Sequence, residues 1–388
     1  MLYGPCLKRH AMLSVIVGAM VFSSTNSFAV EIDPLPPSFS ISDPINSNPS
    51  AAGTLPREGR TSEPSLMPAL PVVDEEKPRT SSVGEIDHSQ HNTGLGAHLH
   101  HTHQLGDWMF EYRTKASIHE GILDKSTQVL TTSLVGTNLP YSYAPTKMTR
   151  TTHMVMGMYG FSNTISLMGM MHIVQNNMSM VRHDLTQDIN LQMSTQGLGD
   201  TFLGVMYRPM SFAMFNLIVS VPSGAVNKEV TVNQSKFVGP YAMQLGTGTY
   251  DFMPSASISY KLGAIGINAE AMYTYHLGKN NQDWALGDEI KASTWISYSP
   301  LKSITANVRL DVNQWAKIED TAPGMTSMSP NYDPKNTGGM NTNIFFNVSG
   351  MFSGVMAGFE WGMPIYQNFK GPQLKTKQQM TLSLQYMF

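Results

Sequence analysis

The sequence predicts an all-β fold, a transmembrane (outer-membrane) antiparallel β-barrel of about 12 strands that follows a disordered N-terminal periplasmic leader. Three observations support this prediction. Apolar and polar residues alternate in long segments after residue 104, short links alternate with long polar links, and the chain ends on the alternating segment QMTLSLQYMF. We therefore expect a signal peptide at residues 1–29, the leader at 30–104 and the barrel at 105–388.

The first residues have the features of a cleaved export signal. Lys8 and Arg9 precede an apolar run at residues 11–22, and the tripeptide at 27–29 is a small-x-small cleavage site. The run has about 12 residues, whereas a spanning helix needs around 20. The only cysteine, Cys6, leaves with the signal. Loss of the two basic residues takes the net charge from −3 to −5, which is too acidic for nonspecific nucleic-acid binding.

The expected leader is rich in proline, serine and asparagine and has almost no aromatic residues, a composition typical of disordered chains. It ends in HSQHNTGLGAHLHHTH, which holds six of the chain's 12 histidines. Because imidazole binds Zn and Cu, the candidate metal ligands of the leader are His98, His100, His101 and His103. The alternative is a polar spacer whose charge depends on pH. No cofactor is required by any other feature.

Alternation with a period of two is clearest in SITANVRLDVN, residues 303–313. Its apolar residues at even positions face one way and its polar residues at odd positions face the other. The same pattern predicts strands near residues 108–118, 148–160, 164–174, 201–207, 215–221, 256–260, 265–275, 290–298, 344–348, 355–363 and 379–388. Together with 303–313 these make 12 segments.

The links between the segments indicate a membrane barrel. Tight links near 162–163, 209–210, 262–263, 300–301 and 353–354 alternate with longer links near 119–147, 175–196, 223–247, 277–287, 317–340 and 366–375. Outer-membrane barrels have short periplasmic turns and long outer loops. An even number of strands then places both ends of the chain on the periplasmic side.

The C-terminal segment is expected to close the barrel. In hydrocarbon every backbone N–H and C=O needs a protein partner, so the last strand must pair with the first. Outer-membrane barrels end on such a strand with a terminal aromatic residue that the barrel-assembly machinery reads, and Tyr386 and Phe388 are similar to that signal. The expected partners are therefore outer-membrane lipids, this machinery and a small-molecule or ion substrate, with the barrel in the outer membrane of a Gram-negative bacterium.

Several stretches resemble one known family: GDWMFEYR at 106–113, APTKMT at 144–149, GLGD at 197–200, MQLGTGTYD at 243–251 and GPQLKT at 371–376. These are similar to members of the family named for the MetA pathway of phenol degradation. The resemblance spans about residues 107–388 and implies an outer-membrane barrel with a transport role. It implies no agreed substrate and no catalytic residue.

The polar faces are expected to point charged side chains into the lumen, because a charge on the lipid face costs about 2–4 kcal/mol near the midplane. These candidates are Glu111, Arg113, Lys115, Arg208, Glu270, Glu289, Lys291, Arg309, Asp311 and Glu360. They either line a polar solute path or form ion pairs that hold a narrow barrel rigid.

Methionine is unusually common, with 29 in the chain. If Ile165, Leu167 and Ile173 face lipid, then Met168, Met170 and His172 face inward, and Met154, Met156 and Met158 join them. Thioether and imidazole together suit Cu ions, which makes Met168, Met170 and His172 further metal candidates. Packing is the alternative, because methionine fills irregular apolar gaps.

The function expected from these features is a channel or transporter for a small solute, with an open question over Cu or Zn handling. The alternatives are a structural or adhesive barrel without conductance, and an outer-membrane lipid hydrolase. A hydrolase is disfavoured because His153 lies beside Thr151 and Thr152, and neighbouring strand residues point to opposite faces. The sequence also lacks GxSxG and HExxH motifs.

Overall fold

The computed structural model describes residues 101–388 except 137, 184–187, 233 and 326–327. The predicted signal peptide and all but the last four residues of the predicted leader lie outside the described residues. Strands dominate the described part, together with four short 3-10 helices. No helix in residues 101–388, with those gaps, is long and apolar enough to cross a membrane.

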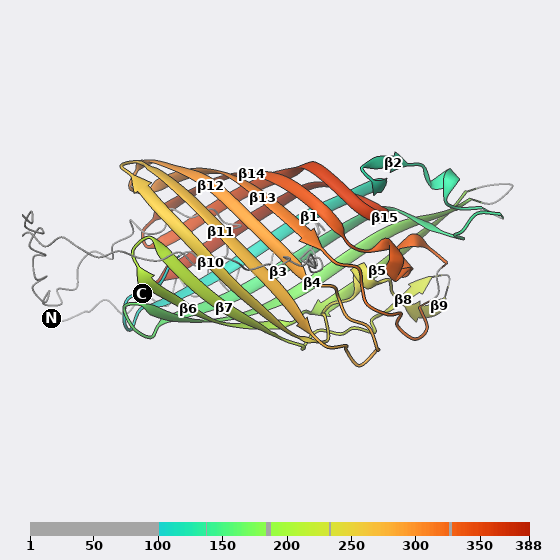
Figure 1. Ribbon diagram of the computed structural model, residues 1–388, viewed down its shortest axis with the longest axis horizontal. Helices are drawn as coiled ribbons and strands as arrows, with labels where there is room; N and C mark the ends of the chain where they lie inside the picture. Colours follow the sequence, from blue (N-terminus) through green and yellow to red (C-terminus); the bar gives the residue numbers. More distant parts are fainter. Residues whose placement is uncertain (1–100, 137, 184–187, 233, 326–327) are drawn as a thin grey trace, which may run out of the picture. The chain divides into compact units, whose positions relative to one another are not determined.

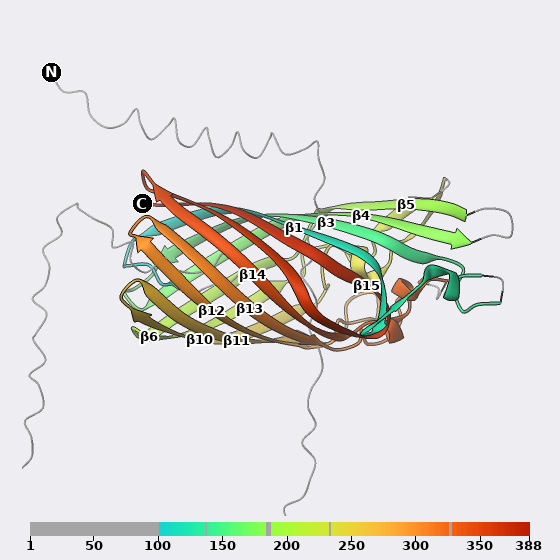
Figure 2. The same ribbon diagram turned by 90° about the horizontal axis from the view of Figure 1, so that it is seen from above.

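The strands form a closed antiparallel barrel, as the sequence predicts (Figures 1 and 2). β1 pairs with β15, so the sheet has no open edge along its wall. In ring order the labelled strands are β1 (Trp108–Lys125), β3 (Ala144–Gly160), β4 (Ile165–His183), β6 (Thr201–Met210), β7 (Ala213–Val221), β10 (Tyr250–Leu262), β11 (Ile265–Leu277), β12 (Glu289–Leu301), β13 (Ile304–Trp315), β14 (Gly339–Phe352) and β15 (Val355–Met387).

β15 reverses its direction, so its 33 residues cross the barrel wall twice. Antiparallel steps from β1 round to β14 leave these two strands running in opposite directions, yet both pair antiparallel with β15. Val355 to Phe369 pair with β14, and Phe369 to Met387 pair with β1. The reversal lies at Gly371, whose φ of 91° suits a residue without a side chain. Eleven labelled strands thus give 12 spanning segments.

Polar side chains connect the two arms of β15. The Gln367 Nε2 donates a hydrogen bond to the Thr376 carbonyl at 3.1 Å, and the Thr376 N–H donates to Gln367 Oε1 at 2.8 Å. This reversal corrects the prediction of a loop at 366–375, because the polar residues there continue the pairing with β14 and β1 instead of leaving the sheet.

β4 has two neighbours on one side. β5 (Asp188–Leu198) pairs with its second half, and β6 pairs with its first half. β5 and β6 therefore follow one another along β4, separated by Gly199 and Asp200. The predicted loop at 175–196 is also wrong, because most of these residues extend β4 and β5 into a long hairpin.

The turns and loops are asymmetric, as predicted. Turns at residues 161–164, 211–212, 263–264, 302–303 and 353–354 are short and share one end with the C-terminus (Figure 1). The other end carries the long links, with β2 (Thr127–Val129), the separate hairpin of β8 (Glu229–Val232) and β9 (Ser235–Val238), and the 3-10 helices η2 (Thr131–Ser133), η3 (Tyr241–Met243), η4 (Pro330–Tyr332) and η5 (Pro334–Asn336). We call these the short-turn end and the long-loop end.

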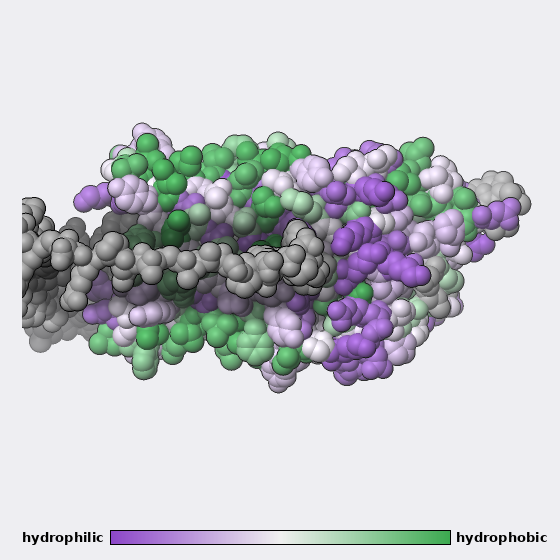
Figure 3. Space-filling view, in the orientation of Figure 1, coloured by the Kyte–Doolittle hydropathy of each residue, from purple (hydrophilic) through white to green (hydrophobic). Residues whose placement is uncertain are grey.

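The predicted faces of the strands are the observed ones. On β13, Val308 is 47% exposed and points outward, whereas Asn307 is 3% exposed and donates to Asn347 inside the barrel at 2.7 Å. On the last arm Leu382 is 55% exposed and Thr381 is 4% exposed. Figure 3 shows hydrophobic residues over the barrel wall and polar residues gathered toward the long-loop end. Hydrophobic side chains thus cover the surface that meets lipid.

Candidate functional site

The interior of the barrel holds a cavity of about 380 Å³. Each strand contributes every second side chain to it, so strands on all sides of the ring line the space. Two opposite parts of the lining differ in chemistry. One, which we call the methionine wall, consists of Met154 and Met156 on β3, Met168 and Met170 on β4, and Phe202 on β6. The other is charged.

The methionine wall continues toward the short-turn end as a buried cluster that fills the lumen there. Its members are Met109, Met156, Met158, Met168, Met206, Met214, Ile218 and Met387. These residues come from strands that are far apart in the sequence and meet only because the barrel closes. Methionine is unbranched and polarizable, so it can repack around apolar groups of different shape.

His172 interrupts the methionine wall with a polar group. It lies opposite Met154 in the β3–β4 register, and its ring stacks on Phe202 with 5.5 Å between ring centroids. The neighbouring Gly199 makes room for it, because a Cβ on Gly199 would lie 2.0 Å from His172 Nε2. The break between β5 and β6 therefore positions this imidazole.

The charged wall is a compact ion cluster on β12, β13 and β15. Arg309 pairs with Asp311, and its Nη2 lies 2.9 Å from Glu360 Oε1. Lys291 Nζ is 3.5 Å from the same Asp311, and the Arg309 guanidinium lies 4.1 Å from the centre of the Phe345 ring. Charges of both signs neutralise one another there, so this wall offers no strong field of one sign.

The six remaining charged candidates for the lumen lie outside this ion cluster. Arg113, Lys115 and Glu289 also line the cavity, and Arg113 Nε is 2.6 Å from the buried carboxylate of Glu111. Arg208 and Glu270 are half-buried on β6 and β11 and are outside the set of residues that line the cavity. Eight of the ten candidates thus surround the lumen directly or through a partner.

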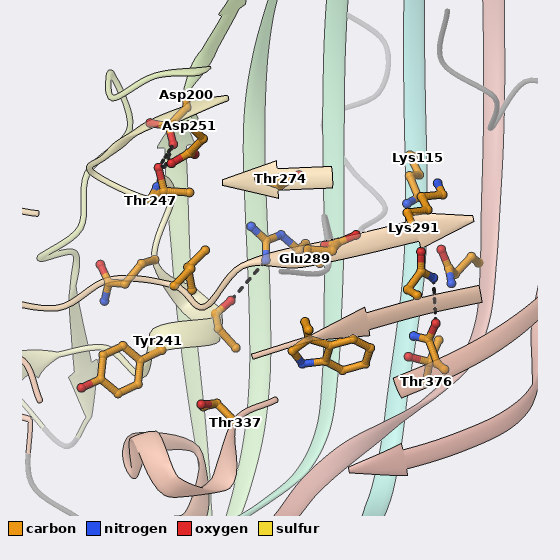
Figure 4. A pocket seen from close by; sticks show the side chains of 18 of the residues that line it. Lys115, Asp200, Tyr241, Thr247, Asp251, Thr274, Glu289, Lys291, Thr337 and Thr376 are labelled. Carbon is orange, nitrogen blue, oxygen red and sulfur yellow. Dashed lines mark hydrogen bonds between the residues drawn. The ribbon is translucent and has the colours of Figure 1, made fainter. Parts of the chain in front are cut away.

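A polar network that sequence reasoning did not identify joins two of the family-like stretches (Figure 4). Asp200 of GLGD accepts hydrogen bonds from the Thr247 N–H at 2.7 Å and the Gly224 N–H at 2.8 Å. Thr247 also donates to Asp251 of MQLGTGTYD at 3.0 Å, and Asp251 Oδ1 is 2.7 Å from His276 Nδ1. The sequence shows the two short motifs, but it does not show that they touch, because only folding brings them into contact.

The long loops cover the long-loop end with an apolar cluster of Val226, Tyr241, Trp284, Ile318, Ala322 and Met325. The Tyr241 and Trp284 rings meet edge-on with 5.0 Å between centroids, and the Ala322 N–H donates to the Tyr241 hydroxyl at 3.0 Å. Burial raises the pKa of Tyr241 and that of Tyr332, the latter to about 12. These phenols therefore stay neutral and act as packed loop residues.

Residues 101–107 pack against the short-turn end. The His103 N–H donates to Ser166 Oγ at 2.8 Å, and Gly106 N donates to the Gly160 carbonyl at 2.9 Å. The His101 and His103 side chains are buried, with 4.9 Å between their ring centroids. This segment therefore belongs to the packed structure of the short-turn end.

The metal candidates remain predictions. His98 and His100 lie outside the described residues, whereas His101 and His103 lie in the packed segment at the short-turn end. Within residues 101–388, apart from the gaps, the structure contains no group of three or more His, Cys, Asp or Glu side chains placed to hold a metal ion. Met168, Met170 and His172 line the cavity together, as their spacing predicts.

His153, the histidine of the lipid-hydrolase alternative, contacts a tyrosine. His153 Nδ1 lies 2.8 Å from the Tyr112 hydroxyl on the neighbouring strand β1, and the two rings stack with 6.2 Å between centroids. The neighbouring Thr152 is fully buried, while His153 is half-buried. Thr152 points to the opposite face of β3, and Thr151, on the same face as His153, has a hydroxyl without a hydrogen-bond partner among the described residues, so neither threonine makes the nucleophile and base contact that hydrolysis needs.

Comparison with known proteins finds one family model that matches part of the chain and solved structures with a similar fold. The family model described as "Putative MetA-pathway of phenol degradation" matches residues 137–324. No curated protein matches the chain. An outer membrane channel from Pseudomonas putida F1 has 11% sequence identity and a TM-score of 0.50, and the match covers 74% of this chain and 97% of that one.

Two further solved structures are similar at lower scores. The CymD monoaromatic hydrocarbon channel has 10% identity and a TM-score of 0.38, over 74% of this chain and 88% of its own. The P. putida toluene transporter TodX has 8% identity and a TM-score of 0.39, over 73% and 89%. The family model and the P. putida F1 channel confirm the resemblance drawn from the sequence: the model matches residues 137–324, and the chain has the fold of that outer membrane channel.

Proposed function

We propose that this protein is an outer-membrane channel for small apolar and aromatic molecules. The main observation behind the proposal is the methionine wall. It presents thioether and aromatic surface inside a barrel whose other inward positions are mostly polar. An apolar solute gains from leaving water at such a surface, whereas hydrated ions and sugars gain nothing from it.

The family match supports the same class of solute. Its name refers to phenol degradation, and a cell that degrades an aromatic compound must first admit it. The charged wall is consistent with this role, because Arg309, Asp311, Glu360 and Lys291 are already paired with one another. Their mutual pairing leaves the methionine wall as the surface that distinguishes solutes.

A structural barrel without transport is the second candidate. The specific observation in its favour is that packed side chains fill the barrel on both sides of the cavity, with the buried methionine cluster toward the short-turn end and the loop cluster around Tyr241 at the long-loop end. A channel with this structure needs both clusters to move during passage, whereas a structural barrel does not.

Uptake by intact cells tests the proposal, because the outer leaflet of the outer membrane is the barrier of interest. Cells with the protein should take up radiolabelled toluene several-fold faster than cells with an empty vector. The pair Met156→Gln and Met170→Gln, which keeps side-chain length but adds polar atoms to the methionine wall, should remove most of this gain. Met328→Gln is the matched control, because Met328 is 51% exposed in a loop. Equal uptake with and without the protein would favour the structural barrel.

A further inference from the structure

We infer that His172 forms a binding subsite for hydroxylated aromatic solutes of the phenol class, which deepens the proposed function and depends on it. The ring of such a solute would contact the methionine wall, and its hydroxyl would bind the imidazole. This assigns a specificity-determining residue to the cavity and distinguishes phenols from plain hydrocarbons.

The apolar surroundings of His172 are the first part of the argument. Met154 lies across the strand pair, Met170 is two residues earlier on the same face of β4, and Phe202 stacks on the imidazole. All four residues line the cavity. A flat aromatic molecule fits this lining, because thioethers and ring faces both make favourable contacts with aromatic groups.

The polar atom of His172 is the second part. His172 is 5% exposed, and its Nδ1 has no hydrogen-bond partner among the side chains and backbone groups that the structure describes. A buried polar atom without a partner destabilises a protein, so such atoms are uncommon unless another molecule supplies the bond. Nε2 lies beside Gly199, which has no side chain, and His172 lines the cavity, so a molecule in the cavity can supply the missing hydrogen bond to the imidazole.

The chemistry of a phenol matches this atom whichever ring nitrogen carries the proton. A phenolic hydroxyl donates to a bare nitrogen and accepts from a protonated one, whereas a hydrocarbon does neither. The hydroxyl of an unsubstituted phenol resembles that of tyrosine, with a pKa of about 10, so the solute is neutral at pH 7 and can leave water for an apolar site.

The test compares phenol with toluene, which have the same ring and similar size, in the uptake assay described above. His172→Phe keeps a flat ring against Phe202 but removes the hydrogen bond. It should lower phenol uptake by about tenfold, the factor expected for one lost hydrogen bond, and leave toluene uptake within about twofold. His172→Gln keeps a hydrogen-bonding group and should retain part of the phenol uptake.

His153→Phe is the matched control, because the same substitution one register position away changes the β1 contact to Tyr112 and not the cavity. Uptake is normalised to folded, heat-modifiable barrel, and His172→Leu replaces His172→Phe if that variant does not fold. Equal losses of phenol and toluene uptake, or unchanged phenol uptake, would overturn the subsite while leaving the channel intact. Wild-type protein that admits neither solute would refute the proposed function instead.

Discussion

Removal of the Arg309 charge should destabilise the barrel strongly. Arg309 is 2% exposed, pairs with Asp311 and Glu360, and covers the Phe345 ring at 4.1 Å. Arg309→Met keeps much of the side-chain length but takes this cation away from the buried carboxylates of Asp311 and Glu360, while Lys291 Nζ stays 3.5 Å from Asp311. Breaking a buried ion pair by removing one partner costs about 3–5 kcal/mol, and we expect a loss of stability in this range.

The matched control removes all four charges of the cluster together. The quadruple variant with Lys291→Met, Arg309→Met, Asp311→Asn and Glu360→Gln leaves no unpaired charge of the cluster behind, so it should recover most of the stability. Urea unfolding of the barrel in lipid vesicles, followed by tryptophan fluorescence, measures both free energies of unfolding. The reasoning is wrong if the free energy of unfolding of Arg309→Met lies within about 1 kcal/mol of the wild-type value, or if the quadruple variant is as unstable as the single one.

Three further predictions concern the ends and the lipid face. Deletion of Phe388 should lower the amount of heat-modifiable barrel in the outer membrane, because its N–H and C=O pair with Trp108 at 3.0 and 2.9 Å and its ring stacks on Phe110; unchanged amounts would contradict this. Val308→Arg should reduce folded protein far more than Val308→Leu, since a cation near the bilayer midplane costs about 2–4 kcal/mol, and equal yields would show that this face does not meet lipid. Burial lowers the pKa of His103, so its neutral form is favoured when residues 101–107 are packed. The packing of residues 101–107 should therefore be stable above the unfolded pKa of about 6.5 and should weaken as the pH falls below it. Protease cleavage near residue 104 would detect this change, and His103→Asn should remove the pH dependence. Cleavage that does not change with pH would exclude the mechanism.

The sequence alone determined the class of fold and the orientation of the strand residues. Alternation is a local property: once a segment is a strand, neighbouring side chains must point to opposite faces. Val308 and Asn307, or Leu382 and Thr381, could therefore be assigned to lipid and lumen without any knowledge of their neighbours. The contrast between short and long links likewise predicted the closed antiparallel ring with 12 spanning segments.

Tertiary structure decided where the strands end and what meets inside. The polar residues of β4, β5 and the β15 reversal have the composition of loops, and only their pairing partners keep them in strands. The contacts of His172 with Phe202, of Asp200 with Thr247 and of Arg309 with Glu360 join different strands or loops. Each depends on the stagger of the strands around the closed ring, and that stagger is set by all the pairings together rather than by any local pattern in the sequence.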